Sequence, residues 1–112
     1  MEGAYVAHID SFAFAECHNL TTVRFPRVNY IGNYTFMNCF ALKFFFSQVV
    51  PTIEWHTFKG CTNERFLVIP KPLFPDALNW EDAGFDLMEN PLPPLTNPKY
   101  SNVKEDTISF DI

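Results

Sequence analysis

The chain has 112 residues, of which 47% are hydrophobic, and phenylalanine alone supplies 13 of them. That length and composition are typical of one domain with a substantial core. No apolar run is long enough to span a membrane. The net charge of −5 and the lack of Lys/Arg clusters predict no binding to nucleic acid.

A 22-residue repeat organises the first two thirds of the chain. Its copies run over residues 9–30, 31–52 and 53–74, and each begins with an isoleucine. Three columns recur without change: Ile9, Ile31 and Ile53; Phe14, Phe36 and Phe58; Cys17, Cys39 and Cys61. A fixed period in the range of about 20 to 50 residues is typical of a solenoid. The sequence therefore predicts an α/β repeat solenoid with one supersecondary unit per copy.

Residues 1–8 fit the end of a preceding copy, because Val6 stands one period before Val28. The strand of that copy would start before Met1, so we expect an open parallel edge at the amino end. Open edges readily pair with other chains. Two interpretations follow: the chain is a fragment or shortened paralogue of a longer array, or a partner or second copy covers this edge through self-association.

Each copy is expected to contain one strand after its cysteine. The segments are LTTVRF (20–25), LKFFFS (42–47) and ERFLVI (64–69), and stacked parallel they would form a small sheet. A proline follows the first and third of these strands (Pro26 and Pro70), and proline ends a strand because it has no N–H to donate. Gln48 stands in the corresponding place in the second copy.

The segment before each cysteine should be a short helix or turn on the side opposite the strands. Phe14 and Cys17 are three residues apart, as are their copies, and such a pair shares one face of a helical turn. We expect both side chains to point inward. Burial of one phenylalanine contributes about 1.5 to 3 kcal/mol, and stacking lets each ring cover the next.

The pattern fails after Phe74, where an acidic, Pro-rich tail (75–112) begins. The basic and acidic residues balance through Pro70, so the whole net charge lies in residues 71–112. Residues 76–83 could form a short helix begun by Asp76 and stopped by Gly84. Residues 90–98 should be extended because of their prolines. Residues 107–112 alternate polar and apolar, which indicates a strand.

We expect the end of this tail to cap the repeats or lie against them, with Ile108 and Phe110 packed onto the repeat units. The alternative is a disordered acidic tail. The two readings predict opposite rates of amide exchange for residues 107–112.

The order of these columns resembles the BspA-type leucine-rich repeat. The residues that carry the likeness are Leu20, Val23, Phe25, Pro26, Val28, Ile31, Phe36 and Cys39, with their copies one period away. The resemblance implies a curved right-handed solenoid with a parallel sheet on its concave side. It also implies protein binding without catalysis, as in surface and adhesion proteins of bacteria and parasitic protists. Ser47, Gln48 and Glu64 depart from the pattern.

The compartment depends on whether the chain is complete. The amino end lacks the basic start and long apolar stretch of a secretory signal. A complete chain is therefore expected in the cytoplasm, and a piece of a longer family member at the cell surface.

The cysteine spacing matches neither a C-x-x-C pair nor a zinc pattern, so we expect buried free thiols rather than a disulfide framework or metal site. Cys17-His18 could suggest a nucleophile, but neighbouring residues rarely face each other, and no third orienting residue is evident. The sequence therefore predicts no enzyme activity, no cofactor and no metal.

The outward positions of the strands are the candidate site. They are expected to form a patch on the concave face that binds a protein partner, and large apolar patches usually mark contact sites. The alternatives are that the tail covers the patch, or that a one-residue shift of register buries it. The six residues are Thr22, Arg24, Phe44, Phe46, Phe66 and Val68.

Overall fold

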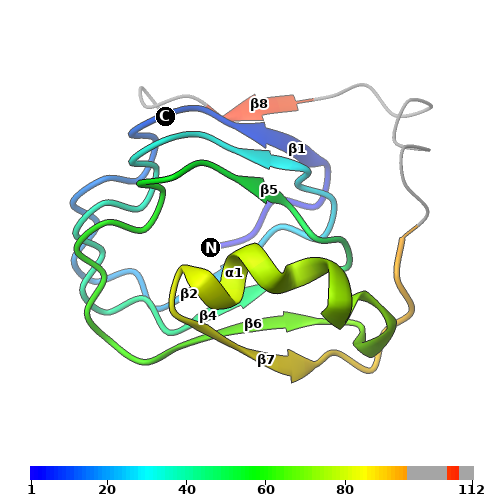
Figure 1. Ribbon diagram of the computed structural model, residues 1–112. Helices are drawn as coiled ribbons and strands as arrows, with labels where there is room; N and C mark the ends of the chain where they lie inside the picture. The colour runs from blue at the N-terminus through cyan, green and yellow to red at the C-terminus, as the bar shows by residue number, and fades with distance from the viewer. Residues whose placement is uncertain (96–105, 109–112) are drawn as a thin grey trace.

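The computed structural model describes residues 1–95 and 106–108, and the chain forms two parallel sheets that face each other across one core (Figure 1). The first sheet has the order β2-β4-β6-β7, and the second has the order β5-β3-β1-β8. The first sheet contains β2 (Thr22–Arg24), β4 (Phe44–Phe46), β6 (Arg65–Ile69) and β7 (Phe85–Glu89). The second contains β1 (Val6–Ile9), β3 (Tyr30–Ile31), β5 (Thr52–Ile53) and β8 (Asp106–Ile108).

The 22-residue period is also the register of both sheets. Val23 pairs with Phe45 and Phe45 with Leu67 in the first sheet, while Ile9 pairs with Ile31 and Ile31 with Ile53 in the second. Equivalent residues of successive copies therefore lie side by side.

The second sheet corrects the expectation that only turns or helices face the strands of the first sheet. The isoleucine column that opens each copy lies in short strands instead, as Ile31 does in β3. Ile31 is fully buried, and so is Val28, three residues before it. Two residues are too few to display the alternation that identifies a strand, so the sequence pattern could not reveal these elements.

The sequence predicted a short helix or a turn around each phenylalanine and cysteine. The structure has turns in these segments and no helix. Their amides bond to the next copy: the N–H of Phe14 donates to the carbonyl of Thr35 and that of Phe36 to Thr57, each at 2.9 Å. Left-handed backbone at Glu16 and Asn38 (φ 66° and 59°) further prevents a helix.

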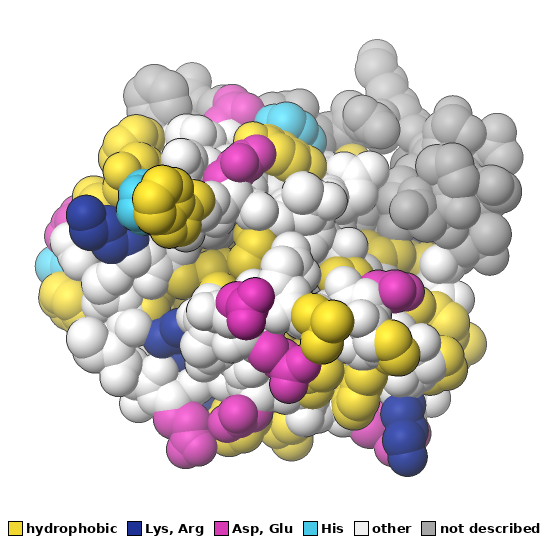
Figure 2. Space-filling model, in the orientation of Figure 1, with side chains coloured by type: hydrophobic (Ala, Val, Ile, Leu, Met, Phe, Trp, Pro, Cys, Tyr) yellow, Lys and Arg dark blue, Asp and Glu magenta, His cyan; other side chains and the backbone are white. Residues whose placement is uncertain are grey.

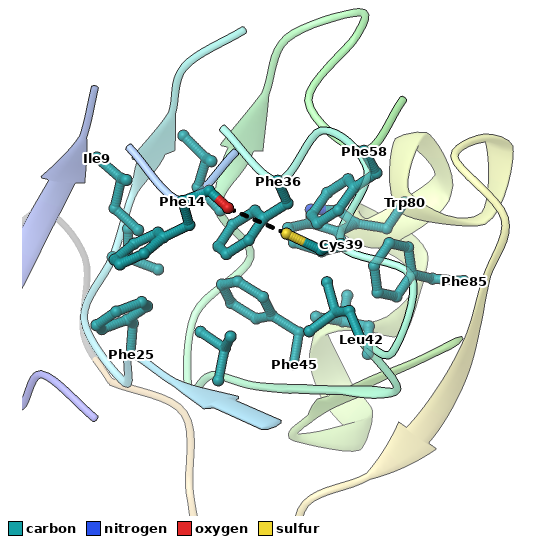
Figure 3. Packing of buried hydrophobic residues seen from close by; sticks show 14 of the residues in the cluster. Ile9, Phe14, Phe25, Phe36, Cys39, Leu42, Phe45, Phe58, Trp80 and Phe85 are labelled. Atoms are coloured by element: carbon teal, nitrogen blue, oxygen red, sulfur yellow. Dashed lines mark hydrogen bonds between the residues drawn. The ribbon is translucent and has the colours of Figure 1, made fainter. Parts of the chain in front are cut away.

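The core lies between the two sheets and is built on a phenylalanine column (Figure 3). The ring of Phe36 stacks between those of Phe14 (centroids 5.4 Å apart) and Phe58 (5.3 Å). Thr35 and Thr57 support the column, because their hydroxyls donate to the Gly32 carbonyl at 2.7 and 3.1 Å.

The sequence repeat ends at Phe74, whereas the first sheet continues. Trp80, one period after Phe58, is fully buried and lies 5.2 Å from the Phe58 ring. Its indole N–H donates to the Pro51 carbonyl at 2.9 Å. Strand β7 then pairs with β6 at a spacing of 20 residues, as in Leu67 with Leu87. The sequence pattern does not reveal this turn, because Trp80 replaces the repeat phenylalanine and because β7 follows β6 at 20 rather than 22 residues.

Two helices precede β7. They are the 3₁₀ helix η1 (Lys71–Ala77) and helix α1 (Leu78–Asp82). The predicted start at Asp76 is wrong, because α1 follows Ala77 and no side chain caps it. The predicted stop is close to the observed one: Gly84 adopts φ +91°, a conformation that glycine accepts without strain.

The amino-terminal edges, which were expected to be open, are both occupied. Residues 1–3 run along β2: the N–H of Arg24 donates to the Met1 carbonyl at 2.8 Å, and the N–H of Gly3 donates to the Arg24 carbonyl at 3.0 Å. In the second sheet β8 pairs in parallel with β1. Self-association through this end remains a prediction, and a second copy would have to displace these segments.

The tail is described in part. Residues 90–95 form no helix or strand, and the rest of the predicted extended segment (96–98) lies outside the described residues. The backbone of β8 covers residues 106–108. The predicted packing of Ile108 and Phe110 side chains also lies outside the part that the structure describes.

Candidate functional site

The outward side chains of the first sheet form the candidate site. The middle residues Val23, Phe45 and Leu67 point into the core and are fully buried. Their neighbours Phe44 and Phe46 are half-buried and face the other side. The alternation follows from the two-residue period of a strand, and it is the register predicted from the sequence rather than the one shifted by a residue.

Aromatic contacts hold this face together across the strands. The rings of Phe44 and Phe66 stack at 5.6 Å, and those of Phe44 and Phe46 lie 5.8 Å apart. The guanidinium of Arg24 lies 4.0 Å from the centroid of the Phe46 ring. A cation over an aromatic face is attracted by its quadrupole, so Arg24 is held flat against the apolar floor.

A hollow of about 550 Å³ crosses the carboxyl ends of these strands. Four of the six predicted residues line it: Arg24, Phe44, Phe46 and Val68. Thr22 and Phe66 belong to the same sheet but are outside the lining. They pair with Phe44 in adjacent strands, at the other end of the face.

Val68 was expected to be exposed, but only 6% of its surface is accessible. Its neighbours in register are Phe46 on β4 and Met88 on β7. Both side chains are longer, and a valine between them is shielded. The sequence could not indicate this because β7 follows a different spacing.

Sequence reasoning missed the walls of the hollow. One wall comes from the amino-terminal residues Glu2, Gly3 and Ala4, and the other from Met88 through Leu92. Gln48, which replaces the repeat proline, holds the second wall through two hydrogen bonds. Its side-chain amide donates to the Pro93 carbonyl at 3.0 Å, and its backbone carbonyl accepts from the N–H of Leu95 at 3.0 Å. The replacement of the repeat proline by Gln48 was the one sign in the sequence that this position makes contacts of its own.

The rim of the hollow is polar and carries both charges. Glu2 approaches Arg24, with 3.8 Å between Oε1 and Nε, and Glu89, Asn90 and Gln48 lie at other points of the lining. An apolar floor with a polar rim is the usual anatomy of a protein interface.

The cysteines are free thiols. Cys39 is fully buried, whereas Cys17 and Cys61, at the two ends of the column, are half-buried. The Cys39 thiol donates to the Phe14 carbonyl and the Cys61 thiol to the Phe36 carbonyl, both at 3.1 Å. Burial raises the pKa of Cys39 to about 12, which disfavours the thiolate that nucleophilic chemistry requires.

The histidine beside Cys17 contacts other residues. Nε2 of His18 lies 3.0 Å from Oε1 of Glu16, and its ring stacks on Phe40 at 4.8 Å.

Among the residues that the structure describes, no three His, Cys, Asp or Glu side chains group to hold a metal ion. None of the described helices is long and apolar enough to cross a bilayer.

Arg65 is a buried charge that the repeat pattern did not predict. Its guanidinium donates to the carbonyls of Cys61 (2.6 Å) and Ala83 and lies 4.9 Å from the Phe85 ring. Burial lowers its pKa. Because these partners come from the third repeat and from the segment before β7, Arg65 ties β7 to the repeats.

Comparison with known proteins supports the same architecture. The family model described as BspA type leucine rich repeat region (6 copies) matches residues 3–74. The chain belongs to this family. Its members generally mediate protein–protein interactions and are typically not enzymes. Neither the curated proteins nor the solved structures contain a match.

Proposed function

We propose that this chain is a short leucine-rich-repeat solenoid that binds a protein partner through the outer, concave face of its first sheet. The observation that carries the proposal is the aromatic floor of the hollow, where Phe44 and Phe46 are half-buried and Arg24 lies against Phe46. Aromatic and arginine side chains dominate the binding energy of many interfaces.

The floor has apolar surface that a partner could remove from water. Met88 is 41% exposed and Leu92 is 56% exposed, and both line the hollow beside the two phenylalanines. Each apolar square ångström buried contributes about 25 cal/mol. One large apolar side chain of a partner, placed over these residues, would therefore stabilise a complex appreciably.

The rings are already held in place before any partner arrives. Phe44 contacts Phe46 and Phe66, and Arg24 contacts Phe46, so few side-chain rotations remain to be lost on binding. A preorganised surface loses less conformational entropy on association. This favours a binding role over the alternative, in which the chain is a structural fragment of a longer array without a partner of its own.

The test is a selection of displayed random peptides on the purified protein. Peptides enriched on the wild type are then measured against the double variant Phe44→Ser/Phe46→Ser. We expect binding to be lost while the melting temperature changes little, because both side chains lie outside the core.

The matched control is Phe12→Ser/Phe40→Ser, which removes two phenylalanines that are 49% and 47% exposed at the turns. This control should bind the selected peptides as the wild type does. Equal binding by both double variants would contradict the proposed site. Unfolding of Phe44→Ser/Phe46→Ser would instead show that these residues stabilise the core.

A further inference from the structure

The edges of the two sheets differ in what covers them. Residues 1–3 pair with the outer edge of β2, and β8 pairs with β1. The edge strand β5 has two residues, and the carbonyl of the adjoining Pro51 accepts the indole N–H of Trp80. Strand β8 is itself the outer strand of the second sheet and has three residues. Strand β7, the outer strand of the first sheet, is the longest edge strand that the structure describes, with five residues in continuous register with β6.

The backbone of β7 presents a regular row of polar groups on its outer side. The N–H of Asn90 donates to the Ile69 carbonyl of β6 at 2.9 Å. Because backbone groups alternate along a strand, Asp86 and Met88 also direct theirs toward β6, and Leu87 and Glu89 direct theirs away. No hydrogen bond joins the outward groups of Leu87 and Glu89 to another residue of the described part of the chain.

Natural edge strands are usually protected by proline, by charged side chains, especially lysine, or by a bulge. Strand β7 has no proline, no lysine and no irregularity in its pairing with β6, and its charged residues, Asp86 and Glu89, are both acidic. Carboxylates discourage an acidic or identical strand, but an edge of this length can accept one more strand that carries the opposite charge.

The charge around the edge is mainly negative. Its cations are the exposed Lys71 at the start of η1 and the buried Arg65, whose guanidinium lies 4.9 Å from the Phe85 ring. Residues 72–95 contain no Lys, Arg or His, and their acidic residues lie on or beside η1, α1 and β7. Acidic side chains gather over α1 and β7 in the face shown in Figure 2. These residues are Asp76, Glu81, Asp82, Asp86 and Glu89.

We propose that β7 is a docking edge for an extended, basic segment of a partner protein, which adds to the first sheet as a further strand. The partner's backbone pairs with the outward groups of Leu87 and Glu89, and its Lys or Arg side chains lie near Asp86, Glu89 and the acids of α1. A second copy of this chain would bring the same carboxylates against one another, so charge disfavours that occupant.

The site adjoins the proposed partner face, because Glu89 also lies on the rim of the hollow, but it uses the backbone edge of β7 rather than the aromatic floor and is tested separately. The probe is an eight-residue peptide of alternating lysine and valine with blocked ends, and hydrogen exchange of the protein is followed by NMR at low salt. We expect the peptide to slow exchange at the amides of Leu87 and Glu89. A peptide of alternating glutamate and valine should leave both rates unchanged.

A third peptide separates strand pairing from simple charge attraction. It is the lysine–valine peptide with alternate backbone amides methylated, which keeps its charge and removes the donors on one edge. We expect about tenfold weaker binding, as for a lost pair of backbone hydrogen bonds. Equal binding by both lysine peptides would overturn the proposal, since only charge would then be recognised.

Two variants of Glu89 complete the test. Glu89→Pro removes the outward N–H without removing a bond to β6, and proline is tolerated on an edge strand in that position. We expect it to abolish protection of Leu87, while Glu89→Gln, which keeps the N–H, retains protection with weaker affinity.

Asp10→Lys, a charge reversal at the turn after β1, is the remote control and should bind as the wild type does. Protection of Leu87 and Glu89 that rises with protein concentration in the absence of peptide would assign the edge to a second copy and overturn the proposal. So would unchanged exchange rates at millimolar lysine–valine peptide.

Discussion

The phenylalanine column offers a direct measure of what stacking contributes to this fold. Phe36 is fully buried, lies between the rings of Phe14 and Phe58, and meets the Phe45 ring edge-on at 6.1 Å. Loss of its transfer free energy costs about 2 to 3 kcal/mol. The neighbouring rings are held by turn-to-turn hydrogen bonds and cannot collapse into the space, so a cavity term adds to this cost. We expect Phe36→Ala to destabilise the protein by about 4 kcal/mol.

Phe12→Ala provides the comparison within the same repeat. Phe12 stacks on Tyr34 at 5.1 Å, nearly the same distance as in the buried column, but its side chain is half exposed. Its truncation should cost about 1 kcal/mol. The two side chains stack at nearly the same ring distance, and they differ in burial and in the number of neighbouring rings.

The assay is urea denaturation followed by circular dichroism, with the free energy of unfolding extrapolated to water. A natural domain of this size has a stability of about 5 to 15 kcal/mol, so a loss of 4 kcal/mol is readily measured. Equal losses for Phe36→Ala and Phe12→Ala, at unchanged denaturant slopes, would refute the reasoning, because burial would then contribute nothing beyond surface stacking.

Two further predictions concern the thiol column and the turn that follows the repeats. Trp80→Phe leaves the buried Pro51 carbonyl without its donor and should lower the free energy of unfolding, measured by urea denaturation, by about 1 to 3 kcal/mol. Trp55→Phe should lower it very little, because the Trp55 side chain is 88% exposed. Equal effects of the two variants would contradict the turn assigned to Trp80. The Cys39 thiol ionises near pH 9 in the unfolded chain and near 12 in the folded one, so the unfolded state binds fewer protons between these values and the free energy of unfolding falls as pH rises. We expect this fall to be steeper in the wild type than in Cys39→Ala, and parallel curves from pH 9 to 12 would show that the thiol stays accessible.

Much of the candidate site followed from local sequence. The alternation in residues 44–46 fixes which of three consecutive phenylalanines enters the core, because a strand sends neighbouring side chains to opposite faces. Phe45 is accordingly buried, and Phe44 and Phe46 face the other side. The walls of the hollow did not follow, since they come from residues 2–4 and 88–92, which lie outside the repeat.

The sequence by itself determined the period, the inward columns and the register of the first sheet. These features depend on contacts between equivalent residues, so they leave the same side chain at the same place in every copy. Ile9, Ile31 and Ile53 lie side by side for this reason, and so do the rings of Phe14, Phe36 and Phe58.

Only the tertiary structure decided the second sheet, the turn built on Trp80 and the coverage of the amino-terminal edges. A two-residue strand such as β3 is stable only through its neighbours, and its own residues show no alternation. Trp80 takes the phenylalanine position because its ring packs on Phe58 as the rings of the column do, while its indole N–H satisfies the Pro51 carbonyl, and neither contact shows in the sequence. The alternation over residues 107–112 predicted a strand, and β8 overlaps it, but the partner of β8 did not follow from the sequence. Strand β8 and residues 1–3 meet their partner strands through backbone groups, which every sequence carries, so the order of side chains does not identify those partners.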